Sequence, residues 1–118
     1  MSKQRSQGTS LETATAAFLE GLGDVTRETL HGARDVGDIH GVYLAGAPVV
    51  VECKHYRGRY ELSEWTGELE REMRNAGTPY GFVVAKRRGF SLENNPGAQY
   101  AITTLETMAA ILAAVRGE

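Results

Sequence analysis

A short apolar run that ends in an acid and a lysine is the feature that most constrains this chain. Residues 49–54 read Val-Val-Val-Glu-Cys-Lys and directly follow Pro48. A run this short, bounded by proline and rich in β-branched residues, is typical of a strand. The period of two places Val49, Val51 and Cys53 on one face, and Val50, Glu52 and Lys54 on the other. Two opposite charges therefore share one face of an otherwise apolar strand.

Segments typical of strands alternate along the chain with segments typical of helices. Apolar residues at helical spacing predict helices over residues 11–22, 62–76 and 105–115. Short alternating or β-branched runs predict strands over residues 25–30, 38–43, 49–54, 80–85 and 99–103. The second and third strands form a hairpin, and the next strand is reached through a helix. This αβββαββα order predicts an α/β fold with a mixed sheet and helices packed on it.

Length and composition favour a single domain for these elements. The chain has 118 residues, of which 42% are hydrophobic, and a formal net charge of −2. This is the size of one domain, and the charge gives no global basic field for nucleic acid. Residues 1–8 are polar, and we expect a flexible leader there and the domain over residues 9–118. No stretch approaches the ~18 apolar residues of a membrane span, and the single cysteine, Cys53, fits a reducing compartment, so we expect a cytoplasmic protein without a membrane partner.

A second acid, Asp38, stands on the strand that precedes this run. Adjacent hairpin strands can bring the carboxylates of Asp38 and Glu52 together. Two facing carboxylates repel unless a hard divalent cation such as Mg²⁺ bridges them through their oxygens. Lys54, on the same face as Glu52, is placed to hold a water molecule or to stabilise a developing phosphorane charge. This pattern indicates metal-assisted phosphodiester hydrolysis.

The order of elements and these three residues resemble the PD-(D/E)XK nuclease superfamily, whose core is αβββαβ. Within it, residues 7–12, 32–41 and 49–54 are similar to the small Holliday-junction-resolvase-like nucleases, including versions common in bacteriophages. The resemblance covers nearly the whole chain, but Gly37 stands where the family name has proline, and the overall charge is acidic. It implies a restriction-endonuclease-like fold with a mixed central sheet flanked by helices in a single domain.

The resemblance also implies a role for each matching residue. Asp38 and Glu52 match the metal-binding acids, and Lys54 matches the catalytic lysine. Glu12 matches the glutamate of the first helix that many resolvases add to the metal shell, and the main-chain carbonyl of Cys53 would be a further ligand. The implied cofactor is Mg²⁺, with Mn²⁺ as its substitute.

Glu12 has a second interpretation that needs no metal. Thr9 and Glu12 have the spacing of a capping box, in which Thr9 caps the helix and Glu12 reaches back to the amide of the cap residue. Glu20 lies on the same predicted helix, about 80° around it, and is the alternative third acid. The sequence leaves open which glutamate completes the site.

Local clusters of arginine and lysine supply the expected DNA contacts. They are Arg57, Arg59, Lys86, Arg87 and Arg88. The predicted helix over residues 62–76 carries more charges, and there we expect a solvated face with ion pairs along the helix. Its members are Arg71, Arg74, Glu68, Glu70 and Glu72.

These expectations favour a Mg²⁺-dependent endodeoxyribonuclease that hydrolyses phosphodiester bonds in branched DNA. The resemblance implies a Holliday junction resolvase that acts as a homodimer on four-way junctions and breaks the P–O3′ bond to leave a 5′-phosphate. Reading DNA shape is more economical than reading bases for a chain of one domain. The alternatives are another nuclease on the same scaffold (nicking, repair or restriction-like), a non-catalytic DNA-binding module, or an interaction protein whose Glu-x-Lys triplet is coincidental.

Overall fold

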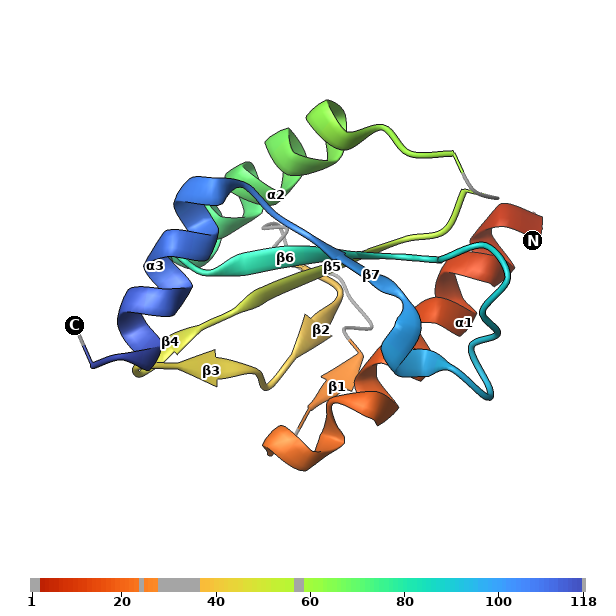
Figure 1. Ribbon diagram of the computed structural model, residues 1–118, viewed down its shortest axis with the longest axis horizontal. Helices are drawn as coiled ribbons and strands as arrows, with labels where there is room; N and C mark the ends of the chain where they lie inside the picture. The colour runs from red at the N-terminus through yellow and green to blue at the C-terminus, as the bar shows by residue number, and fades with distance from the viewer. Residues whose placement is uncertain (1–2, 24, 28–36, 57–58, 118) are drawn as a thin grey trace.

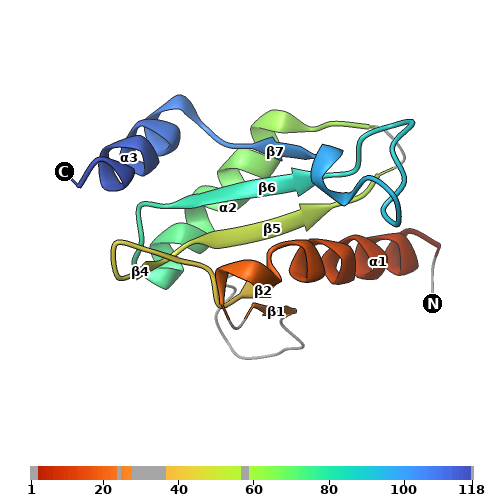
Figure 2. The ribbon, with the colours of Figure 1, turned by 60° about the horizontal axis from the view of Figure 1, so that its bottom comes forward.

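A mixed five-stranded sheet lies between two of the three helices (Figures 1 and 2). The computed structural model describes residues 3–23, 25–27, 37–56 and 59–117. The strand order is β1-β2-β5-β6-β7. Strands β5 and β6 are parallel, and the other neighbouring pairs are antiparallel. The predicted α/β fold with a mixed sheet is therefore confirmed.

The bounds of the elements follow the expected order. The sheet consists of β1 (Thr26–Arg27), β2 (Ile39–His40), β5 (Val50–Lys54), β6 (Gly81–Ala85) and β7 (Tyr100–Ile102). A separate two-stranded ribbon consists of β3 (Tyr43–Leu44) and β4 (Ala47–Pro48). The helices are α1 (Lys3–Phe18), α2 (Leu62–Ala76) and α3 (Leu105–Val115), with 3₁₀ turns η1 (Glu20–Leu22) and η2 (Pro96–Ala98). Within the described part of the chain, none of these helices combines the length and apolar character needed to cross a membrane.

Helix α1 differs from the predicted helix at both ends. It spans Lys3–Phe18 instead of residues 11–22, so Thr9 lies inside the helix and not at its N-terminus. Residues 3–8, where a flexible leader was expected, have helical backbone. A helix that is nucleated by a packed turn extends at little cost into neighbouring residues, even where no apolar stripe marks them. After Phe18 the chain passes into η1, which places Glu20 outside α1.

The strand expected over residues 38–43 is divided into two. Ile39 of β2 pairs with Val51 of β5, whereas β3 turns away and pairs with β4. Gly41 stands between the two pieces with φ of 99°, a conformation that residues with a Cβ rarely adopt. Of the strand expected over residues 25–30, β1 is the described part, and residues 28–30 lie outside the described ranges.

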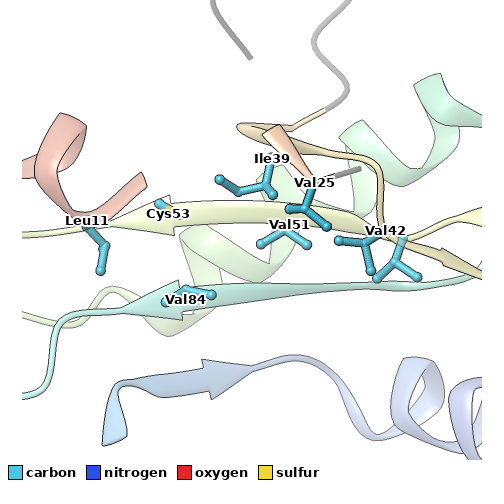
Figure 3. Close-up of a cluster of buried hydrophobic side chains, with 8 residues drawn as sticks. Leu11, Val25, Ile39, Val42, Val51, Cys53 and Val84 are labelled. Carbon is cyan, nitrogen blue, oxygen red and sulfur yellow. The ribbon is translucent and has the colours of Figure 1, made fainter. Parts of the chain in front are cut away.

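Each face of the sheet has its own buried apolar cluster. Leu11 of α1 and Val51 of β5 belong to the cluster on one face (Figure 3). Leu69 of α2 belongs to the cluster on the other face, together with Val50 and Val83. Successive residues of β5 thus alternate between α1 and α2, as the period of two predicts. Figure 2 shows α1 in front of the sheet and α2 behind it.

Candidate functional site

The predicted acids meet at the carboxyl-terminal end of β5. Asp38 directly precedes β2, and its amide donates to the carbonyl of Val51 at 2.9 Å. The Asp38 side chain turns back to the same strand, where Oδ2 accepts a hydrogen bond from the amide of Cys53 at 2.8 Å. The carboxylate thus takes the place of a main-chain acceptor in the β2–β5 ladder. These two bonds hold Asp38 beside Glu52.

Gly37 makes this approach possible. Its φ is 107°, which excludes proline, whose ring fixes φ near −65°. A Cβ on this residue would lie 3.1 Å from Cγ1 of Val50 and 3.2 Å from the carbonyl oxygen of Val51. The departure from the proline of the family motif therefore has a local cause, since the backbone that brings Asp38 to β5 requires glycine here.

Glu52 is buried, with 7% of its surface exposed, on the side of the sheet that α2 covers. Its carboxyl hydrogen-bonds with the carboxyls of Asp38 and Glu72. Burial, these hydrogen bonds and the charges of both neighbours raise the pKa of Glu52 far above its usual range. Glu52 therefore keeps its proton at neutral pH in the metal-free protein, which lets three carboxyl groups share a small volume.

Lys54 lies two residues after Glu52 on β5 and on the same face of the strand. Glu68 of α2 holds it in an ion pair. Lys54 Nζ is 2.7 Å from Glu68 Oε1, and the two side chains are 15% and 31% exposed. Burial lowers the pKa of Lys54, but the hydrogen bond and charge of Glu68, with the charge of Glu52, outweigh it and raise the pKa. Lys54 is therefore a charged ammonium with a fixed direction.

A pocket of about 210 Å³ opens beside this ion pair. It is lined by Lys54, Tyr56, Arg59, Glu61, Glu64, Trp65 and Glu68. The lysine therefore faces solvent-accessible space in which a bound group would reach it. Two of the charged side chains around that space, Glu64 and Glu68, come from the first turns of α2.

Glu68 and Glu72 were not predicted as part of the site. We expected both to pair with arginines on a solvated face of α2, which is wrong: Glu72 is 1% exposed and Glu68 pairs with Lys54. At about 100° per residue, Glu72 falls beside Trp65 and Leu69, inside the apolar stripe of the helix. That position is the sequence signal that would have identified Glu72 as buried.

Cys53 points to the opposite face, toward α1, where its Sγ donates to Oγ1 of Thr15 at 3.7 Å. Burial raises the pKa of the Cys53 thiol, and the charges of Asp38 and Glu12 add to the increase. Glu12 thus lies within electrostatic range of this end of β5, but on the α1 side. Glu20 lies in η1 and is exposed.

The donor groups at Asp38 and Glu52 fit a hard divalent cation, which would replace the shared proton between the two carboxyls. In residues 3–23, 25–27, 37–56 and 59–117, no group of three or more histidine, cysteine, aspartate or glutamate side chains is arranged to hold a metal ion. The side chains therefore offer the paired acids as ligands, and Glu12, whose charge acts on Cys53, stays a predicted ligand. The Cys53 carbonyl remains a predicted ligand.

Basic residues lie beside the same end of the sheet. The amide of Lys86 donates to the carbonyl of Lys54 at 3.2 Å, which carries the β5–β6 pairing one residue further. The hydroxyl of Tyr60 donates to the carbonyl of Lys86 at 2.8 Å and so ties the segment that contains Arg59 to the same place. Of the predicted DNA contacts, Arg59 and Arg88 are exposed and Lys86 is half-buried.

The remaining predicted DNA contacts are Arg87 and Arg57. The guanidinium of Arg87 lies over the rings of Phe90 and Tyr100, at 4.2 and 5.3 Å from their centroids. Stacking on two rings fixes the Arg87 side chain against the protein. Arg87 therefore adds positive charge to the surface, but its side chain does not extend away from it. Arg57 lies outside the described residues.

Comparisons of this chain with protein-family models, with curated proteins and with solved structures find no match. The chemistry of the site is therefore judged from its own residues. They are two carboxyls in contact, a charged lysine on the same strand, and exposed basic side chains at the same end of the sheet.

Proposed function

We propose that the protein is a Mg²⁺-dependent endodeoxyribonuclease with a restriction-endonuclease-like core, and that Asp38, Glu52 and Lys54 form its catalytic centre. The observation that carries this proposal is the contact between the Asp38 and Glu52 carboxyls at the end of a central strand, with Lys54 on the same face. A buried acid pair with a neighbouring ammonium is costly to fold. Binding a cation and a phosphate offsets that cost.

Each residue has a role that follows from its place. Mg²⁺, when bound, neutralises the scissile phosphate and lowers the pKa of the attacking water. Asp38 and Glu52 would hold the cation through their oxygens, and Glu52 would give up its proton to do so. Lys54, directed by Glu68, stabilises the charge that develops on the phosphate oxygens. The water gives up a proton as its oxygen bonds to phosphorus, the P–O3′ bond breaks, and O3′ takes a proton, so that one water is added in total and a 5′-phosphate is left.

We propose branched DNA, and four-way junctions in particular, as the substrate. Arg59, Lys86 and Arg88 lie at the edge where β5 and β6 end, so they can neutralise phosphates on either side of the cleaved bond. The net charge of −2 disfavours strong binding to any duplex, and favours a substrate whose shape brings several phosphates to one edge. A homodimer would present two such edges to the two equivalent strands of a junction.

A non-catalytic DNA-binding module on the same fold is the second candidate. It is favoured by the ion pair that holds Lys54 against Glu68. Other nucleases on this scaffold, with nicking, repair or restriction-like activity, share the same centre. The substrate and its turnover separate these alternatives.

Cleavage of matched substrates tests the proposal. A four-way junction, a flap, a linear duplex and a single strand are incubated with Mg²⁺ and either wild type, Glu52→Gln or the control variant Glu106→Gln, which changes an exposed residue of α3. We expect paired symmetric nicks in the junction with wild type and Glu106→Gln, and a loss of about 100-fold or more with Glu52→Gln. Cleavage of another substrate alone would support the catalytic centre and contradict four-way junctions as the substrate. Binding without Glu52-dependent cleavage would support the module.

A further inference from the structure

Two glutamates of α2, one helical turn apart, contact two alternate residues of β5. Glu68 pairs with Lys54, and Glu72 hydrogen-bonds with Glu52. Four residues of a helix rise about 6 Å and two residues of a strand rise about 6.6 Å, so the two spacings match. The helix therefore runs antiparallel to the strand, and these two contacts set its position along β5 (Figure 2).

Glu72 lies where a docked helix normally carries an apolar side chain. The buried residues of α2 are Trp65, Leu69, Glu72 and Met73, and Glu72 is 1% exposed. Burying a carboxyl group among apolar side chains is unfavourable, and a leucine or methionine would pack at this position at a lower cost in free energy. Packing alone therefore does not explain a glutamate here.

Glu52 has carboxyl neighbours from two different elements. Asp38 stands beside it within the sheet, at the start of the neighbouring strand, whereas Glu72 approaches from the helix that covers this face. Glu72 is more deeply buried than Glu52, which is 7% exposed. It is also one helical turn further than Glu68 from the end of β5, where the pocket opens. Glu72 thus contacts Glu52 from the inner side, away from solvent.

We propose that Glu72 is a positioning residue of the cation site, and that its hydrogen bond holds the Glu52 carboxyl in the direction in which it binds a divalent cation together with Asp38. A glutamate side chain has considerable rotamer freedom, and ordering it at the moment of binding lowers affinity. Carboxylate ligands of metal ions are commonly held by a second hydrogen bond of this kind. This role rests on the proposed function, because it concerns the cation that Asp38 and Glu52 would share.

Calorimetric titration of Mn²⁺ into the metal-free full chain, at one pH and in one buffer, tests this role. Glu72→Leu keeps a side chain of similar size but removes the hydrogen bond, and it should weaken Mn²⁺ binding by about 10–100-fold. Glu72→Gln keeps a hydrogen-bond donor without the charge, and its affinity should stay within about threefold of wild type. Glu70→Leu is the matched control, since Glu70 is half-buried and lies about 160° around α2 from Glu72, and this variant should bind as wild type does.

Urea unfolding in EDTA separates positioning from a purely structural role. Because a cluster of buried carboxyl groups is costly to fold, Glu72→Leu should unfold at the same urea concentration as wild type or at a higher one. Weaker cation binding without a loss of stability is a result that a structural role does not give. A variant that loses stability and binding together would overturn the positioning role.

The remaining outcomes are distinct from one another. Equal Mn²⁺ binding by wild type and Glu72→Leu would show that Glu72 only fills space, and equal losses in Glu72→Leu and Glu72→Gln would show that Glu72 acts through its charge or as a ligand. Either result would overturn the positioning role and leave the cation site in place. A wild-type chain that binds no Mn²⁺ would overturn the proposed function and this role with it, so the two failures are distinguishable.

Discussion

The buried carboxyl of Glu52 couples folding to proton binding. Its pKa in the folded protein lies well above the ordinary value of 4.5, so the folded chain keeps a proton that the unfolded chain loses. A group whose pKa is raised by folding stabilises the protein fully below its unfolded pKa, and the stabilisation is lost as the pH rises. The metal-free protein should therefore become less stable as the pH increases from about 4.5 into the alkaline range.

Glu52→Gln should remove this pH dependence. The amide keeps the shape and a hydrogen-bond donor, and it carries no ionisable proton. In EDTA we expect the variant to exceed wild type in free energy of unfolding by about 1–3 kcal/mol at pH 8, with the difference vanishing toward pH 4.5. Urea unfolding across this range measures it. Glu64→Gln, an exposed change on α2, should follow wild type at every pH, and an identical pH slope for Glu52→Gln would contradict the buried proton.

The ion pair between Lys54 and Glu68 sets the charge of the lysine. Glu68→Gln leaves the burial of Lys54 unopposed by its closest anion, so the pKa of Lys54 should fall relative to wild type. The two side chains are partly exposed, so the free energy of unfolding should change by less than about 1 kcal/mol. NMR titration of the lysine ammonium measures the pKa, and Glu61→Gln, at the same pocket, is the control. An unchanged Lys54 pKa in Glu68→Gln would show that the pair does not form in solution.

Gly37 sets the direction of Asp38. Gly37→Ala adds a Cβ at a φ of 107° and crowds Val50 and the Val51 carbonyl, so we expect a loss of about 1–3 kcal/mol in the free energy of unfolding. Gly46→Ala is the matched control, since it has φ of 79° and nothing within 4 Å of the added Cβ. Chemical denaturation of both variants separates backbone strain from crowding. Equal losses would mean that the contact with β5 contributes nothing.

At the scale of elements, the sequence predicted the helices that have an uninterrupted apolar stripe. Helix α2 has such a stripe and ends at Ala76. Gly77 follows in the left-handed conformation and is the stop signal of the helix. The approach of Asp38 to Glu52 was also predicted, because neighbouring strands of a sheet leave few arrangements. The partners from α2 were not predicted. The place of Glu72 in the apolar stripe would have identified it as buried, whereas the pairing of Glu68 with Lys54 depends on how the helix docks on the sheet.

Other boundaries could not be predicted for physical reasons. The break between β2 and β3 depends on the φ of Gly41, which a glycine permits but does not require. The early start of α1 involves polar residues that have no periodicity. In both places the local sequence is compatible with two conformations, and the rest of the molecule selects one.

The contact between α2 and the sheet should dominate stability at this scale. Leu69 is fully buried in the cluster that contains Val50 and Val83, so Leu69→Ala should lower the free energy of unfolding by about 2–5 kcal/mol. Urea unfolding measures the loss. Leu62→Ala, on the same helix at a residue that is 52% exposed, should cost less than about 1 kcal/mol. Similar losses for the two variants would show that α2 does not dock on the sheet by this face.

At the scale of the whole molecule, the parallel strands β5 and β6 place the acids, the lysine and the basic segment 86–88 at one end of the sheet, where both strands end. The carboxyl ends of parallel strands are where open α/β sheets bind their ligands. Helix α3 lies at the other end of the sheet, next to β3.

Calorimetric titration of Mn²⁺ into the metal-free protein tests most directly whether Asp38 and Glu52 form a cation site. We expect wild type to bind, with an observed heat that varies with the ionisation enthalpy of the buffer, because Glu52 must release its proton. Asp38→Asn and Glu52→Gln should weaken binding by about 10–100-fold, whereas Glu64→Gln should match wild type. Binding that is equal in all four proteins, or absent from wild type, would contradict the assignment of these two carboxyls as the metal-binding centre of a nuclease.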